Sequence, residues 1–164
     1  RVRTPILALI LGFALVSTGC GDSTEGASTL YVRQASPLFK DNESLAKEFL
    51  ELASKLKKEE SDEAELLSRI EYRVLPKARR LARRSARVVP QDEDLAAGHL
   101  KLTASWEARA LVYAQLVKAW KEDDMQALDS AILTHARILA DEDLALEAIN
   151  KVMEPYQLEL HAYP

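Results

Sequence analysis

The sequence predicts an all-α protein, an up-down-up-down antiparallel four-helix bundle that follows a signal peptide and a flexible tether. Three observations predict this class. Apolar residues recur at steps of three and four from Ser36 onward, which is the period of an amphipathic helix. Glycine is scarce, with 5 in 164 residues, and strand-like alternation is confined to residues 156–163. Connections of a few residues make successive helices antiparallel neighbours.

The first two helices are marked by their starting residues. Ser36 and Pro37 fit a cap and a first helical position, and the first helix fades near residues 55–63. Its apolar stripe is Leu38, Leu45, Phe49, Leu52 and Leu56. Asp62 with Glu65 has the spacing of a capping box and opens a second helix that closes before Pro90. Its stripe is Leu67, Ile70, Val74, Leu81 and Val88. Pro76 lies inside it, where we expect a bend that does not end the helix.

The third and fourth helices have the clearest stripes. The third falls inside one narrow arc at 100° per residue: Leu95, Leu102, Trp106, Ala110, Tyr113, Val117 and Trp120. Asp123 with Gln126 again has capping-box spacing, and Pro155 ends the fourth helix. The fourth stripe is Leu128, Ile132, Leu139, Leu146 and Met153. We expect both helices to be about 45 Å long and the first to be shorter.

The start of the chain has the layout of a secretory signal peptide. Arg1 and Arg3 are basic, residues 6–16 are apolar, and the small residues 17–19 lead into Cys20, the only cysteine. The apolar run is too short to cross a bilayer as a helix, for which roughly 20 residues are needed. A lone cysteine cannot form an intramolecular disulfide and lacks the neighbours of a zinc or catalytic thiol site.

Residues 16–20, Val-Ser-Thr-Gly-Cys, resemble the lipobox of bacterial lipoproteins. Gly19 and Cys20 fit that pattern, whereas Ser17 stands where a leucine or valine is usual. The resemblance implies cleavage after residue 19 and a lipid on the Cys20 sulfur. An ordinary secreted protein with a chance cysteine is the alternative. Because Gly21 replaces the aspartate that acts as a retention signal in some lipoproteins, the resemblance favours the periplasmic side of the outer membrane in a host that has one.

The remaining chain is divided by its composition. Residues 20–35 are rich in small polar side chains and are predicted to be a flexible lipid-anchored linker. Residues 36–155 form the predicted bundle, and residues 156–164 form a C-terminal tail. Without Arg1 and Arg3 the chain has 20 basic and 26 acidic residues, a formal charge of −6. This acidic balance argues against a nucleic-acid partner.

One face of the second helix is strongly basic. Between Arg69 and Arg87 there are eight basic residues and one acid, Glu71, and seven of the eight lie within about 120° of the helix circumference. We name five candidate contacts with an anionic lipid surface or an acidic envelope protein: Arg73, Lys77, Arg80, Arg84 and Arg87. The alternative is a solvated face paired with acids of neighbouring helices, such as Glu48, Glu51 and Glu59.

Large aromatic residues and histidines occupy the stripes of helices 3 and 4. Trp106, Tyr113 and Trp120 recur every seven residues, and with His135 they are candidates to line a site for a small apolar ligand or cofactor between these helices. Core anchoring predicts the same spacing. His99 and His135 are expected too far apart to share one metal, so the sequence predicts no metal site and no cofactor. A cavity beside Trp106 or His135 would favour the carrier.

No set of residues in the sequence marks a catalytic centre. Paired carboxylates, a Ser-His-Asp set and a glycine-rich phosphate loop are all absent, so the sequence predicts no enzyme. The order Leu75-Pro76, a proline-led third helix and a Trp-Lys-Glu-Asp-Asp turn loosely resembles small bundle lipoproteins of unknown function, over about residues 62–153. The expected role is therefore a non-catalytic binding or structural one in the cell envelope, with the membrane as partner through the anchor.

Overall fold

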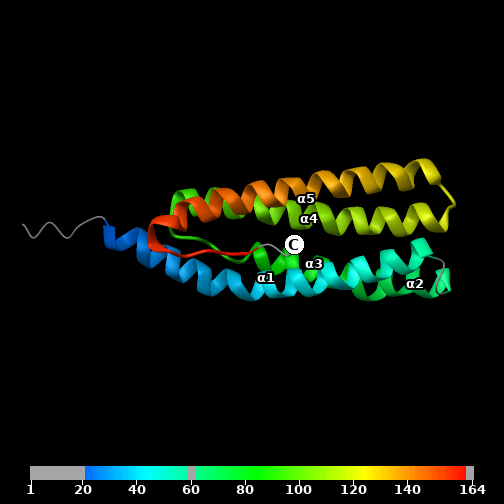
Figure 1. Ribbon diagram of the computed structural model, residues 1–164, viewed down its shortest axis with the longest axis horizontal. Helices are drawn as coiled ribbons and strands as arrows, with labels where there is room; N and C mark the ends of the chain where they lie inside the picture. The colour runs from blue at the N-terminus through cyan, green and yellow to red at the C-terminus, as the bar shows by residue number, and fades with distance from the viewer. Residues whose placement is uncertain (1–20, 59–61, 162–164) are drawn as a thin grey trace, which may run out of the picture.

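Four long helical runs lie side by side along the long axis of the molecule (Figure 1). The computed structural model describes residues 21–58 and 62–161, and every regular element within them is helical. The elements are α1 (Gly21–Lys58), α2 (Glu63–Arg69), the π-helical turn η1 (Ile70–Val74), α3 (Leu75–Ser85), α4 (Glu93–Lys121), α5 (Met125–Met153) and the short 3₁₀ helix η2 (Glu154–Tyr156). The predicted all-α class is confirmed. The signal peptide and Cys20 lie outside the described residues.

The predicted flexible linker over residues 20–35 is wrong for the residues that the structure describes. Residues 21–35 belong to α1, which runs unbroken to Lys58 and is the longest helix in the described part of the chain. Ser36 and Pro37, expected to begin the helix, lie within it, and the Ser36 hydroxyl donates to the carbonyl oxygen of Val32 at 2.6 Å. This part of α1 has a buried stripe that the sequence analysis missed, because most of its residues are small. The stripe consists of Ala27, Ser28, Tyr31, Ala35 and Leu38.

Aspartate side chains cap three of the helices. Asp62 accepts from the Ala64 N–H, as the sequence predicted, and Asp92 accepts from the backbone N–H groups of residues 94 and 95. At the start of α5 the cap is Asp124, and Asp123, predicted for this role, instead adopts a left-handed backbone with φ 55°. The positive φ lets the chain turn within three residues between α4 and α5.

The second helical run continues past Pro76 but contains a π-helical turn ahead of it. This turn is formed by Ile70–Val74, and the Leu75 N–H donates to the Ile70 carbonyl oxygen. A proline removes one N–H and crowds the carbonyl four residues earlier, and one wider turn accommodates both effects. The prediction that the helix does not end here is confirmed. Its last residue is Ser85, earlier than expected from Val88.

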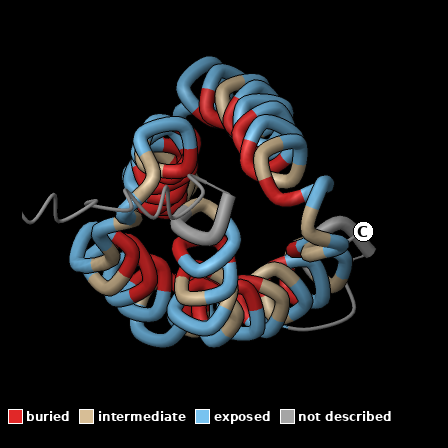
Figure 2. The backbone as a smooth tube through the Cα atoms, turned by 90° about the vertical axis from the view of Figure 1, so that its left-hand side faces the viewer, coloured by how far each residue is buried: buried red, intermediate tan, exposed pale blue. Residues whose placement is uncertain are grey.

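The core lies between the helical runs, where their buried faces meet (Figure 2). Leu95, Leu102 and Ile149 are fully buried, and Gly98 lets α4 approach α5 closely. A Cβ added at Gly98 would lie 2.6 Å from Cγ1 of Ile149. A separate small cluster of Val112, Ala131 and Ile138 joins α4 to α5. Among the described helices, α4 and α5 therefore share the most extensive contact.

The C-terminal tail folds back onto the bundle after η2. Gln157 turns the chain with φ 57°, and the following described residues are neither helix nor strand. The Asn150 side chain donates to the Leu160 carbonyl at 2.7 Å and accepts from the Leu160 N–H at 2.9 Å. Leu160 is thereby held in the core. Among the described helices, none has the length and apolar character needed to cross a membrane.

Candidate functional site

An apolar cavity of about 500 Å³ lies beside the α4–α5 turn. Side chains from every one of the four helical runs line it. The lining residues are Phe49 and Ala53 of α1, Leu67 of α2, Ile70 of η1, Leu116, Val117 and Trp120 of α4, and Met125, Leu128, Asp129, Ile132 and His135 of α5. Asp129 is the single charged residue in this set, so the surface offered to a ligand is mostly hydrocarbon.

The cavity has a buried floor and an exposed rim. Phe49, Leu67 and Ile70 are buried, whereas Met125 is 61% and Ile132 is 53% exposed. These two side chains form the part of the lining that faces solvent. The rim therefore leaves the floor open to a molecule that enters from solvent.

His135 forms one wall of the cavity and packs against two aromatic rings. Its ring centroid lies 5.3 Å from Phe49 and 5.5 Å from Tyr113. Its Nε2 is buried and makes no hydrogen bond within the described residues. Burial, helped by the positive charge of Arg109, lowers the pKa of His135 to about 4. The imidazole is therefore neutral at pH 7, and the wall carries no positive charge.

The four residues proposed from sequence for an apolar site are only partly brought together. Trp120 lines the cavity with His135, and its indole N–H donates to the Glu63 carboxylate. Tyr113 lies behind the lining, stacked on Phe49 with ring centroids 4.3 Å apart, and burial raises its pKa to about 12. Trp106 is not a lining residue.

Trp106 is instead a core anchor. It is 1% exposed and makes an edge-on contact with Phe39 at 5.6 Å between ring centroids. Sequence reasoning also missed the contribution of α1, α2 and η1 to the cavity, because Phe49, Leu67 and Ile70 were read only as core positions. Nothing in their spacing distinguishes a cavity floor from a filled core.

His99 lies in a different polar cluster, between α1, α3 and α4. Its Nε2 is 3.0 Å from the Ser85 carbonyl oxygen, which can only accept, so this nitrogen carries the proton. Tyr31 O–H then donates to Nδ1 at 3.0 Å. Burial lowers the pKa of His99, and the Ser85 hydrogen bond opposes this in part. Ser85 is also 2.6 Å from the Thr103 hydroxyl, so the cluster is internally satisfied.

A buried ionic group that the sequence analysis did not identify joins three helices. Arg109 of α4 lies 3.1 Å from Glu142 of α5 by its Nη1, and its Nη2 donates to Asn42 of α1. The Asn42 amide donates to the other Glu142 oxygen at 2.8 Å. All three side chains are buried. Because the three side chains come from three different helices, their contacts fix how α1, α4 and α5 are aligned.

The basic face of the second run is partly neutralised by α1. Arg73 and Lys77 lie 3.3 and 2.5 Å from the two oxygens of Glu48, and Arg84 pairs with Asp41. Arg80 and Arg87 are exposed and make no ion pair with a described residue. Of the predicted acidic partners, Glu48 is confirmed, Glu51 instead pairs with Lys55, and Glu59 lies outside the described residues.

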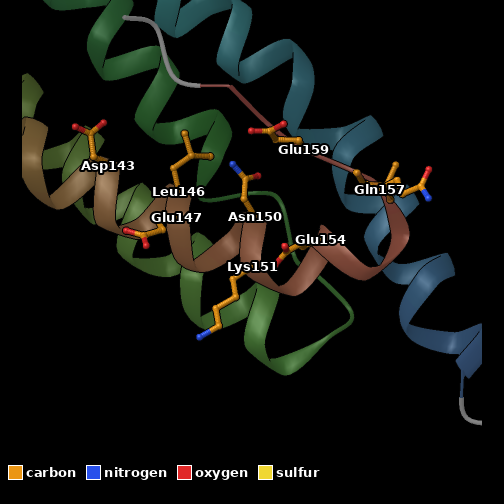
Figure 3. A pocket seen from close by; sticks show the side chains of 9 residues that line it. Asp143, Leu146, Glu147, Asn150, Lys151, Glu154, Gln157 and Glu159 are labelled. Carbon is orange, nitrogen blue, oxygen red and sulfur yellow. The ribbon is translucent and has the colours of Figure 1, made fainter.

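A larger hollow of about 830 Å³ lies between α5 and the tail (Figure 3). Its lining includes four carboxylates and one lysine, namely Asp143, Glu147, Glu154, Glu159 and Lys151. Figure 3 shows the Lys151 side chain directed away from the tail, and carboxylates outnumber cations among the lining residues. Within residues 21–58 and 62–161, no three His, Cys, Asp or Glu side chains are grouped to hold a metal ion.

Comparison with known proteins gives no relative for this chain. No protein-family model, no curated protein and no solved structure matches it.

Proposed function

We propose that this chain is a non-catalytic binding module, an exported lipoprotein whose helical bundle holds a small apolar ligand in the cavity beside the α4–α5 turn. The observation that carries the proposal is the cavity itself. Its volume of about 500 Å³ falls within the 300–1,000 Å³ typical of ligand sites, and its lining is almost wholly apolar. It lies beside His135, where the carrier hypothesis requires it.

The chemistry of the lining favours a neutral ligand with a hydrocarbon body. A charged group would lose its hydration on entering and would find one carboxylate, Asp129, and no cationic side chain among the lining residues. Neutral His135 adds no charge at pH 7. Apolar surface removed from water contributes roughly 25 cal/mol per Å², so burial alone can hold such a ligand.

The up-down-up-down antiparallel arrangement of the bundle is part of this proposal. Two contacts between α4 and α5 support it. Gly98, early in α4, lies against Ile149, late in α5, whereas Arg109 lies against the earlier Glu142. Positions that rise along α4 therefore meet positions that fall along α5, as antiparallel neighbours do.

Export and lipid attachment at Cys20 are supported by the sequence of residues 1–20. α1 begins at Gly21, so a lipid on Cys20 would be followed directly by a helix with no tether between. Phe49 lies 28 residues along α1, or about 42 Å from its start at 1.5 Å per residue. We propose that the bundle stands on the membrane, on the periplasmic side of an outer membrane where the host has one, with its cavity at the far end.

Contact with an anionic surface is a second candidate role, favoured by Arg80 of α3 and by Arg87, two residues after the end of α3, which are both exposed and unpaired. Arg80 and Arg87 are available without breaking an ion pair, unlike Arg73, Lys77 and Arg84. A bundle lying along the membrane, instead of standing on it, would bring this face to the headgroups, where each cation gains roughly 1 kcal/mol. An acidic envelope protein is the other partner that this chemistry fits.

Extraction of the purified full chain with organic solvent, followed by mass spectrometry, tests the binding role. We expect a neutral apolar molecule, released without cleavage of any covalent bond, in amounts approaching one per chain. Mass spectrometry of the same sample tests the anchor, which predicts Cys20 as a lipidated N-terminus. A chain that yields no apolar molecule from the cells that produce it would contradict the carrier, whereas an unmodified Cys20 would contradict the anchor alone.

A further inference from the structure

The outward side of α5 exposes an apolar stripe that has no partner in the described chain. Leu133 is 63% and Leu144 is 64% exposed, and Ala136 and Ala140 between them are also exposed. At 100° per residue these four positions lie within about 80° of the helix circumference. We call them the α5 stripe. It is separate from the cavity, because none of the four lines it.

The α5 stripe has nearly the same spacing when it is read from either end. Leu133 stands three residues before the pair Ala136-Arg137, and Leu144 stands three residues after the pair Ala140-Asp141. If two α5 helices pack in opposite directions, Leu133 of one copy lies beside Leu144 of the other, and the alanines meet at the centre. Small central residues allow a close helix approach, and the same patch serves both copies, which is the geometry of a twofold interface.

Two charged residues beside the stripe complete this complementarity. Arg137 and Asp141 are exposed, lie on the same flank of the stripe and make no ion pair with a described residue. In the antiparallel pairing Arg137 of each copy faces Asp141 of the other, which gives two intermolecular ion pairs. Like flanks meet in an antiparallel helix pair, so both contacts arise from one arrangement.

The charges also argue against a membrane as the occupant of the stripe. Asp141, Asp143 and Glu147 are exposed on or near this side of α5, and anionic headgroups would repel them. A second copy instead supplies an arginine for each Asp141. We propose that the α5 stripe is the interface of a homodimer in which two copies pack antiparallel. This inference goes beyond ligand binding and does not depend on it.

Sedimentation equilibrium of the full chain in density-matched detergent tests the dimer. We expect the mass of two copies at high concentration and dissociation on dilution. Leu133→Glu should leave a monomer, while the control Leu111→Glu, at an equally exposed leucine of α4, should leave the dimer intact. Circular dichroism of each variant checks that the helices are retained.

Charge reversal then tests the direction of packing. Arg137→Asp alone and Asp141→Arg alone should each weaken the dimer by roughly tenfold, because each places like charges in contact twice. The double variant Arg137→Asp with Asp141→Arg restores opposite charges and should recover the affinity of the unaltered chain. A chain that stays monomeric, a dimer that survives Leu133→Glu, or a double variant no better than the singles would each overturn the proposal. So would Leu133-dependent binding to anionic vesicles, which would identify lipid as the occupant.

Discussion

Arg109 Nη1 of α4 lies 3.1 Å from Oε2 of Glu142 on α5, and both side chains are buried. Burying two charges costs solvation free energy, and their attraction returns it only where geometry and further hydrogen bonds are good. Asn42 supplies hydrogen bonds to both partners from α1. The group contributes less to net stability than to alignment, because Asn42, Arg109 and Glu142 meet in only one relative position of the three helices.

Removing one member of this group should destabilise the protein strongly. Arg109→Met leaves Glu142 charged and buried, for which the expected loss in the free energy of unfolding is about 3–5 kcal/mol. Adding Glu142→Leu removes the stranded charge and should recover much of that loss. Urea unfolding of the two variants measures both values. If adding Glu142→Leu to Arg109→Met lowers the free energy of unfolding further, the two side chains are not energetically coupled, and the account of alignment fails.

Acid should destabilise the fold through His135. Its pKa is about 4 when folded, against 6.5 when exposed, so the unfolded chain binds a proton first as the pH falls. The stability from neutral His135 is fully present above pH 6.5 and is lost as the pH falls toward 4. His135→Phe should flatten this part of the melting-temperature profile. His161→Phe, at an exposed histidine, is the matched control and should follow the unaltered chain; equal slopes in all three proteins would contradict the assignment.

Two glycine substitutions should have opposite effects. Gly98→Ala places a methyl group 2.6 Å from Ile149 Cγ1 and should cost about 1–3 kcal/mol as the α4–α5 contact is forced apart. Gly26→Ala meets nothing within 4 Å and should stabilise α1 by about 0.5–1 kcal/mol, since alanine favours a helix. Thermal unfolding measures both. An unchanged stability for Gly26→Ala would instead support a flexible segment at residues 21–35.

The basic face should divide into two functional groups. Arg80→Gln with Arg87→Gln removes two unpaired arginines and should weaken binding to anionic vesicles at low salt without lowering the melting temperature. Arg73→Gln with Lys77→Gln removes the same charge but strands Glu48, which is 14% exposed, and should lower the melting temperature. Co-sedimentation with vesicles and thermal melts separate these effects. Absence of vesicle binding by the unaltered chain would remove the membrane role.

Periodicity and capping residues were sufficient to predict the helical class. The stripes of α4 and α5 contain large apolar residues at steps of three and four. As strands, the same segments would expose many of these side chains to water. The first part of α1 was missed because its buried face uses Ala27, Ser28 and Ala35, which carry little hydrophobic signal, with Tyr31 as the one large anchor. Tyr31 is recognisable only through its hydrogen bond to His99, 68 positions away.

The candidate site was less accessible to sequence reasoning for a related reason. Trp120 was proposed because it recurs with Trp106 and Tyr113 every seven residues, and His135 because a histidine on an apolar stripe is conspicuous. Phe49 and Ile70 were not, because a side chain that lines a cavity and one that fills a core have the same pattern. Whether four helices leave a space between them depends on their separation, which the apolar spacing of each helix does not encode.

Binding of a neutral fluorescent naphthylamine to the full chain tests the carrier most directly, with three proteins compared. The unaltered chain should bind one molecule, and Ala97→Phe, which adds the same ring at an exposed site on α4, should bind equally. Ala53→Phe fills the cavity and should weaken binding by roughly tenfold or more while the helical content is unchanged. Equal binding by Ala53→Phe and the unaltered chain, or no saturable binding by any of the three, would contradict a ligand site beside the α4–α5 turn.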